Sequence, residues 1–296
     1  MAMKFRGHDT FFIRKGWLNK GIKHISAKPD VFVDREENPM DVLGMGSNMV
    51  KSLRYWMQAT GISVEPMSGK RTQKFTSLGD EIHFNDKYIE ELGTLCLLHY
   101  RLATNKELAT AWFYFFNYFT QKEFTRDDYI EALKNFIAME NEPPVALRSL
   151  NEDFNCIINT YVPRIKSNPN KVTAENNIDC PLGELGLIDI VHKGRDTLYR
   201  KSSIKPDYVN PWIALSIIIE QSDGEKSIRL NDLLNNPCNI GKVFNLDTIT
   251  LLEILRKIEK IDEIKIIRTA GLDIVKIKND YSFIECVAKF YESIKN

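Results

Sequence analysis

The sequence predicts a mainly α (α+β) fold, and three observations support this prediction. Apolar residues recur at helical spacing along most of the 296 residues. Short candidate strand pairs lie in the first 85 residues and after residue 170. The hydrophobic fraction of 43% and the charged fraction of 27% are typical of a globular chain long enough for about two domains.

The N-terminal part begins with two candidate helices and a glycine turn. Lys15–Ile25 is predicted to be helical because its apolar residues lie near helical spacing. Asn38 can cap a short helix over 39–43, which opens on a proline, a favoured first helical residue. Gly44–Gly46 then predicts a tight turn.

A longer amphipathic helix follows this turn. Ser47 or Asn48 can cap it, and Gly61 is a natural stop. One buried stripe is formed by Val50, Leu53 and Met57 at i, i+3 and i+7. A second, polar face holds Asn48, Lys51, Ser52 and Tyr55. A short helix, a glycine turn and such a helix indicate a helix-turn-helix.

A candidate hairpin comes directly after the longer helix. Residues 62–65 and 74–76 are predicted strands around a loop that contains Gly69. Thr76-x-Leu78-Gly79-x-x-Ile82 then starts a helix or helical turn, a pattern that recurs after the wing of winged-helix domains. Residues 1–85 are therefore predicted to form a winged helix-turn-helix domain.

The charge distribution agrees with this interpretation. Residues 1–75 hold thirteen Lys/Arg and seven Asp/Glu, a net charge of +6, while the whole chain sums to zero. A basic N-terminal domain joined to an acidic remainder is the distribution that attraction to phosphates requires.

The middle region, residues 86–170, is predicted to be helical. Its helices cover 86–102, 108–119, a segment that Thr125 and Asp128 can cap, and 145–162. The aromatic run from Trp112 to Phe119 is a candidate platform for stacking single-stranded bases, with core packing as the alternative.

The C-terminal region, residues 171–296, is predicted to be a second winged-helix-like domain after a polar linker over 166–178. Its expected elements are a hairpin over 190–201, helices over 211–221, 229–234, 246–261 and 283–294, and two strands around Ala270–Gly271. The sequence thus predicts winged helix-turn-helix domains at the N- and C-terminal ends with a helical middle.

Several classes of protein are disfavoured. The five cysteines are widely spaced and contain no C-x-x-C, so buried reduced thiols are expected rather than a zinc cluster or a disulfide framework. The N-terminus lacks the apolar stretch of a signal peptide, and no apolar run approaches the length of a membrane span, so a cytoplasmic chain is expected. G-x-S-x-G, P-loop and His-Asn-His patterns are absent from the sequence.

The candidate DNA-binding residues lie on the second face of the longer helix, on the hairpin and near the N-terminus. Arg reads guanine and Asn reads adenine through paired hydrogen bonds, whereas lysines contact phosphate. An ordinary solvated face is the alternative, and core packing is an alternative for Tyr55. The candidates are Asn48, Lys51, Ser52, Arg54, Tyr55, Lys70, Arg71, Lys74 and Arg14.

Candidates for phosphodiester chemistry are weaker. His8 can act as a base beside Asp9, and Arg14 can clamp a phosphate, with helix capping or packing as the alternative for His8. Glu184, Asp189, His192 and Lys193 form a polar group that does not fit the Asp…(Asp/Glu)-x-Lys nuclease pattern. Because such hydrolysis often uses a metal held by carboxylates, Mg²⁺ or Mn²⁺ is the expected cofactor, with no organic cofactor.

The chain also resembles a known bacterial family. The matching segments are His8–Asp9–Thr10–Phe11, Arg14, Trp17–Leu18–x–Lys20–Gly21, Leu43–Gly44–Met45–Gly46–Ser47–Asn48–Met49–Val50–x–Ser52–x–Arg54–Tyr55–Trp56, Tyr88–Ile89–Glu90, Thr94–Leu95–x–Leu97–Leu98–His99, Leu150–x–x–Asp153, Thr160–Tyr161–Val162 and Cys180–Pro181–Leu182–x–Glu184–Leu185. These segments are similar to the SspB-like family, whose members occur beside cysteine desulfurases and PAPS-reductase-like sulfurtransferases. The resemblance spans most of the chain.

The resemblance implies a DNA-nicking component of a single-strand phosphorothioation system used against phages. It implies double-stranded DNA as a partner, together with sulfurtransferase, cysteine desulfurase and ATPase partners. It carries no catalytic residues onto this chain. Ser47 stands where the family pattern has a lysine, which implies weaker or shifted phosphate contact. A non-catalytic DNA-binding regulator or adaptor, and a scaffold for the sulfur-transfer enzymes, are the alternatives.

Overall fold

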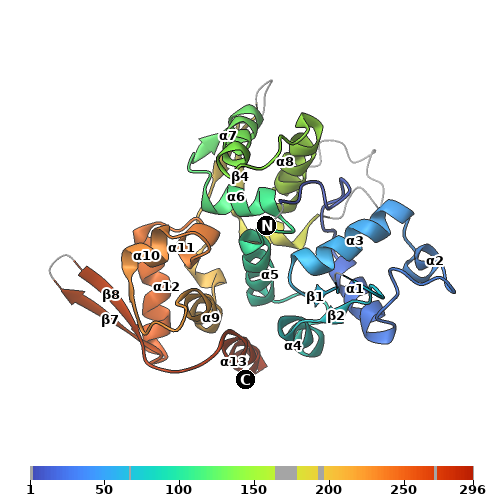
Figure 1. Cartoon of the computed structure of the whole chain (residues 1–296). Coiled ribbons are helices and arrows are strands. Elements are labelled where there is room, and N and C mark those ends of the chain that lie inside the picture. Colours follow the sequence, from blue (N-terminus) through green and yellow to red (C-terminus); the bar gives the residue numbers. More distant parts are fainter. Residues whose placement is uncertain (1–2, 67, 164–178, 193–196, 270–271, 296) are drawn as a thin grey trace.

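The computed structural model describes residues 3–66, 68–163, 179–192, 197–269 and 272–295, and within them it is mainly helical with three small sheets (Figure 1). This confirms the predicted mainly α (α+β) class. Buried apolar side chains from all parts of the described chain form a hydrophobic core cluster. In these residues we find no helix that is both long and apolar enough to cross a membrane.

The N-terminal helices lie close to their predicted positions. They are α1 (Trp17–Ala27), α2 (Pro39–Leu43) and α3 (Ser47–Ala59). The side chain of Asn38 accepts a hydrogen bond from the backbone N–H of Met40 at 3.1 Å, so the predicted cap of α2 is confirmed. The cap predicted for α3 is wrong, because the helix already begins at Ser47 and Gly46 precedes it.

A short hairpin and α4 (Ser77–Asn85) follow α3. Strands β1 (Ser63–Val64) and β2 (Lys74–Phe75) pair antiparallel. The Thr76 hydroxyl donates to the carbonyl of Gly61 at 2.6 Å and accepts from the N–H of Gly79 at 2.9 Å. A Cβ at position 79 would lie 1.9 Å from the carbonyl oxygen of Ile62. The Thr-x-Leu-Gly pattern therefore caps α4 and lets it pack directly against the hairpin.

The described part of the middle region, residues 86–163, contains four helices. They are α5 (Leu92–Thr104), α6 (Thr110–Asn117), α7 (Arg126–Met139) and α8 (Leu147–Tyr161). The capping box that was predicted at Thr125 and Asp128 is confirmed. The predicted helix start at residue 86 is wrong. The Asp86 carboxylate accepts from the N–H groups of Glu90 and Glu91 at 3.0 and 3.1 Å and holds a turn, so α5 begins only at Leu92.

The aromatic run from Trp112 to Phe119 lies mostly in the core. All its aromatic members except Tyr118 are buried. The rings of Phe115 and Phe124 meet edge to face with their centres 5.5 Å apart, and the ring centres of Tyr114 and Phe136 are 4.8 Å apart. Core packing is therefore the correct interpretation, and the run offers no continuous surface for stacking bases.

A sheet joins the middle and C-terminal regions. Its strand order is β3-β5-β4, with β3 (Glu123–Phe124), β4 (Ile188–His192) and β5 (Leu198–Lys201). On β5, the ammonium group of Lys201 donates to the carbonyls of Phe115 and Phe119, the latter at 2.6 Å, and so caps the end of α6. Burial lowers the pKa of Lys201 to about 7. No local pattern in the sequence predicted β3, and the predicted division at residue 170 stays a prediction.

The remaining C-terminal elements include a second hairpin. The helices are α9 (Pro211–Gln221), α10 (Leu230–Asn235), α11 (Ile240–Val243), α12 (Thr248–Lys260) and α13 (Phe283–Lys295). Strands β6 (Ser227–Arg229), β7 (Ile264–Thr269) and β8 (Leu272–Ile277) form a sheet in the order β6-β8-β7. In Figure 1 the β7–β8 hairpin projects from the rest of the molecule. All five cysteines are free thiols, and four are buried.

Candidate nucleic-acid interface and its buried support

The N-terminal segment packs across α3 and covers much of its predicted polar face. The Phe11 carbonyl accepts from the hydroxyl of Ser52 at 3.3 Å and from the indole N–H of Trp56 at 2.9 Å. The Tyr55 hydroxyl donates to the carbonyl of Leu108 at 2.9 Å. Ser52 and Tyr55 are buried. Their assignment as DNA contacts is therefore wrong, because both side chains bind the protein itself.

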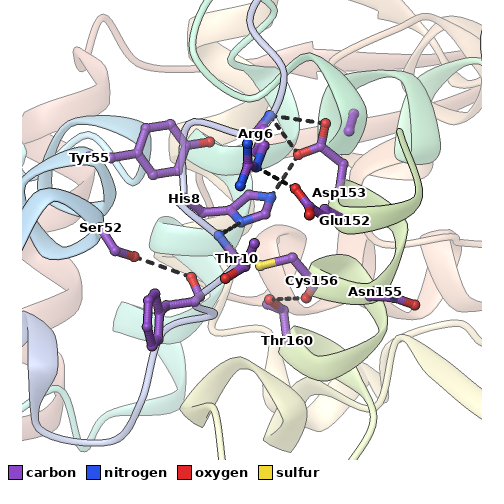
Figure 2. A network of polar contacts seen from close by, with 12 residues as sticks. Arg6, His8, Thr10, Ser52, Tyr55, Glu152, Asp153, Asn155, Cys156 and Thr160 are labelled. Carbon is purple, nitrogen blue, oxygen red and sulfur yellow. Dashed lines mark hydrogen bonds and ion pairs between the residues drawn. The ribbon is translucent and has the colours of Figure 1, made fainter. Parts of the chain in front are cut away.

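A buried pair of polar side chains fastens this segment to α8. His8 Nε2 lies 2.7 Å from Asp153 Oδ1, and both side chains are buried. The backbone N–H of Arg6 also donates to Asp153, and the Arg6 side chain forms an ion pair with Glu152. Figure 2 shows the His8 ring between Tyr55 and the carboxylate of Asp153.

The tautomer of His8 follows from its partners. The N–H of Thr10 donates to Nδ1 at 3.1 Å, so that nitrogen carries a lone pair and the ring proton sits on Nε2, facing Asp153. Burial raises the pKa of Asp153 from its ordinary value, while the hydrogen bond from His8 opposes that rise.

These contacts decide between the two interpretations of His8. Its ring stacks on Trp56 at 6.0 Å, both of its nitrogens are occupied, and it is fully buried. A general base must reach the proton that it removes. The structure therefore supports packing and not catalysis. Asp9 is half-buried, with a φ of 50° in a turn.

One stripe of α3 remains exposed to solvent. Asn48 and Lys51 are exposed, and Arg54 and Gln58 are half-buried one and two turns farther along. Their spacing of three to four residues places all four on the same side of the helix. We call these residues the α3 stripe.

An ion pair joins the α3 stripe to the hairpin. Arg54 binds Glu65 through two nitrogens, at 2.8 and 2.5 Å. Arg71 lies 3.9 Å from the same carboxylate and its side chain is 62% exposed. Lys51 makes no ion pair within the described residues, and its nearest polar contact is Asn48 at 3.4 Å. Of the two cations on the α3 stripe, Lys51 is therefore better placed than Arg54 to meet an external anion.

The other predicted cations lie on or near the β1–β2 hairpin and near the N-terminus. Lys74 is exposed on β2. Lys70 is exposed but pairs with Asp30 at 2.7 Å. The Arg14 guanidinium lies 5.8 Å from the Phe11 ring and 5.5 Å from the Trp17 ring, and it is half-buried there. Arg71 is thus linked to the α3 stripe through Glu65, whereas Lys70 pairs with Asp30 and Arg14 stacks on Phe11 and Trp17.

The second predicted polar group is dispersed. Glu184 and His192 are exposed, and Asp189 accepts a hydrogen bond from the hydroxyl of Ser202 at 2.5 Å. Lys193 lies outside the described residues. Within the described ranges, no three His, Cys, Asp or Glu side chains converge on a point that suits a metal ion. The structure therefore assigns no residues to Mg²⁺ or Mn²⁺.

Sequence reasoning missed the residues that support the interface. Asp153 was noted only within a matching segment, since nothing in the local sequence shows that α8 meets the N-terminus. Gln58, which lies on the α3 stripe, was also missed. The spacing of Gln58, seven residues after Lys51, was a signal that a stricter helical count would have found.

Comparisons with known proteins agree with this architecture. A family described as "Protein of unknown function (DUF4007)" matches residues 5–291. A solved structure described as "Magnesium ion-bound SspB crystal structure" is 22% identical with a TM-score of 0.82, and the match covers 100% of this chain and 90% of that one. An "SspB crystal structure" is also 22% identical, with a TM-score of 0.80 and coverage of 99% and 95%. The search of curated proteins gave no match. The SspB-like resemblance is therefore confirmed as a shared fold.

Proposed function

The chain belongs to the DUF4007 family. We propose that it binds duplex DNA and nicks it within a phosphorothioation-based anti-phage system. DNA binding and nicking are separate claims with separate support. The first draws on the charges of this chain, and the second on its likeness to SspB.

The proposed binding unit is a winged helix-turn-helix. In it α2, the turn at Gly44 and α3 form the helix-turn-helix, and the β1–β2 hairpin is the wing. The C-terminal α10, α12 and β7–β8 form a second winged-helix-like unit, to which we assign no DNA contact. In the N-terminal unit the longer helix lies in the major groove and the wing contacts the DNA backbone.

The observation that carries the DNA-binding proposal is the α3 stripe. Asn48 and Lys51 are exposed on the first half of α3, and Lys51 has no carboxylate partner among the described residues. In this assignment Asn48 reads a base edge and Lys51 holds a phosphate. Arg54 supports the wing through Glu65 rather than reading bases.

One solved structure of this fold is described as magnesium-bound, which supports Mg²⁺ or Mn²⁺ as the cofactor to test. The proposed partners are duplex DNA and the sulfurtransferase, cysteine desulfurase and ATPase enzymes of a phosphorothioation system.

A plasmid experiment tests the two claims together. The purified chain is incubated with supercoiled plasmid and Mg²⁺ or Mn²⁺, and the products are resolved on an agarose gel. Open circles that disappear with EDTA are expected. Tight binding without open circles would assign a non-catalytic regulator or adaptor. The absence of a plasmid shift at low salt would contradict DNA binding and favour a scaffold.

A further inference from the structure

A groove of about 850 Å³ lies beside the α3 stripe. Its walls come from β1, the start of α4, the end of α5 and the start of α13. Figure 1 shows the β1–β2 hairpin, α4 and α13 on one side of the molecule. The Thr94 and Tyr291 hydroxyls, 2.7 Å apart, join α5 to α13. The groove therefore lies between the N-terminal and C-terminal parts of the chain, and its walls belong to elements that pack against one another.

Cations line the groove, and nearby carboxylates neutralise their charge only in part. Lys4 has no carboxylate within ion-pair distance among the described residues, and its ammonium group lies 5.4 Å from the Tyr55 ring. Partial burial lowers the pKa of Lys4, and the Glu65 carboxylate opposes this. Glu65 already binds Arg54 at 2.5 and 2.8 Å, so Arg71 at 3.9 Å is held only loosely. The remaining acid on the wall is Glu107.

A third cation is fixed in place before any ligand arrives. Arg101 binds Glu220 at 2.9 Å, and its guanidinium lies 4.2 Å from the centre of the Phe283 ring. Gly61 has a φ of +71°, and a Cβ there would lie 2.9 Å from the Arg101 stem. The glycine therefore both ends α3 and makes room for Arg101. Pre-positioned groups bind a ligand at a lower entropic cost.

Apolar side chains also line the groove. Val64 is 55% exposed, and Ile284 and Phe283 are half-buried. Cations that hold phosphates and apolar surfaces that accept base faces are the two features of single-strand binding sites. The groove is continuous with the surface formed by the α3 stripe and the β1–β2 hairpin. The residues shared by the two surfaces are Gln58, Glu65 and Arg71.

We infer that this groove binds an unpaired segment of a DNA strand that continues from duplex bound on the α3 stripe. The inference rests on the proposed DNA binding and adds the strand that a nick would release. Lys4 and Arg71 hold phosphates, and the wall of Val64 and Ile284 accepts a base. A strand is favoured over a free nucleotide because the groove is open at Val64 and Arg71 and joins the α3 stripe.

Protection of an engineered thiol from modification tests whether an oligonucleotide occupies the groove, and it does not depend on nicking activity. Val64→Cys places an accessible thiol on the wall, while four of the native cysteines are buried and Cys238 is half-buried. Modification by a methanethiosulfonate reagent is followed by mass spectrometry, with and without a thymidine oligonucleotide of about 12 residues. At about ten times its dissociation constant the oligonucleotide should slow modification about tenfold. The wild-type chain gives the background, and Met139→Cys, 81% exposed on α7, should show no protection.

Each outcome has a defined meaning. No protection by the oligonucleotide, or equal protection of the Met139→Cys thiol, would overturn the inference. Protection by thymidine monophosphate or inorganic phosphate as strong as that by the oligonucleotide would replace the strand with a free nucleotide or anion. Lys4→Ala should weaken oligonucleotide binding by about fivefold and leave duplex binding unchanged, while Lys134→Ala on α7 should change neither. Duplex binding is measured separately, so its failure would refute the proposed function while leaving the thiol result to decide on the groove.

Discussion

The N-terminal and C-terminal ends of the molecule repeat the same order of elements with different charge. Each places a short helix, a longer helix and a hairpin in succession. Residues 1–75 carry a net charge of +6, whereas residues 209–296 hold twelve Lys/Arg and thirteen Asp/Glu, a net charge of −1. On the C-terminal hairpin, Lys265 and Lys278 form ion pairs with Glu259 and Asp262. The two ends therefore combine a similar order of elements with different net charge.

Hydrogen bonds of a buried histidine connect each end to the middle region. We call the contacts of His8 the N-terminal tie and those of His99 the C-terminal tie, and the two differ in their partners. His8 binds the carboxylate of Asp153 on α8. His99 on α5 accepts from the hydroxyl of Tyr161 at 2.8 Å and donates to the carbonyl of Val243 at 2.7 Å, which holds the C-terminal part. The N-terminal tie depends on a charged acceptor and the C-terminal tie on neutral groups.

The largest expected effect comes from breaking the N-terminal tie. Asp153→Ala leaves the His8 ring and the Arg6 N–H without their partner, so the free energy of unfolding should fall by about 3 kcal/mol. Urea denaturation followed by circular dichroism measures the change. Arg148→Ala, an exposed cation on the same helix, should leave the midpoint unchanged. A midpoint for Asp153→Ala equal to that of the wild type would contradict the role of this pair.

The C-terminal tie should respond to pH. Burial lowers the pKa of His99 from 6.5 to about 4. The unfolded chain therefore binds the proton more readily, and stability is full above pH 6.5 and falls as the pH decreases towards 4. Between pH 6.5 and 5 this loss is about 2 kcal/mol.

The measurement compares urea unfolding at pH 7 and pH 5 in the wild type and in His99→Gln. Between pH 7 and pH 5 the free energy of unfolding of the wild type should fall by about 2 kcal/mol more than that of the variant. Equal falls would show that His99 does not titrate as its burial requires.

A matched pair of cations tests the contrast in charge directly. Lys51→Ala on α3 should weaken duplex binding about fivefold and make the logarithmic salt dependence shallower by about one. Arg256→Ala removes an exposed cation from α12, the corresponding C-terminal helix, and should leave both unchanged. Fluorescence anisotropy over a salt series gives both values. Equal losses in the two variants would remove the distinction between the two ends.

The smallest effect is expected at the wing. Lys70 is 74% exposed and already pairs with Asp30, so Lys70→Ala should not shift the denaturation midpoint measurably. Its effect on duplex affinity should be smaller than that of Lys51→Ala, because Asp30 already neutralises part of its charge. A larger loss of affinity than that of Lys51→Ala would move the main DNA contact from α3 to the hairpin.

The local elements could be predicted from the sequence because their signals are local. Asn38 before Pro39 marks the start of α2, and Thr125 with Asp128 marks the start of α7. Ser52 and Tyr55 were misassigned because helical spacing shows which residues share a face and not what covers that face. The Ser52 hydroxyl donates to the carbonyl of Phe11 and the Tyr55 hydroxyl to the carbonyl of Leu108, and both partners lie more than forty residues away in the sequence. Asp153 and β3 were missed for the same reason.

The capping of α6 by Lys201 has a consequence for synthesis of the chain on the ribosome. The carbonyls of Phe115 and Phe119 emerge more than eighty residues before the ammonium group that binds them. During translation that end of the helix, and the edge of β3, stay open to water or to other nascent chains. Folding of the middle region is therefore completed only after β5 has left the exit tunnel.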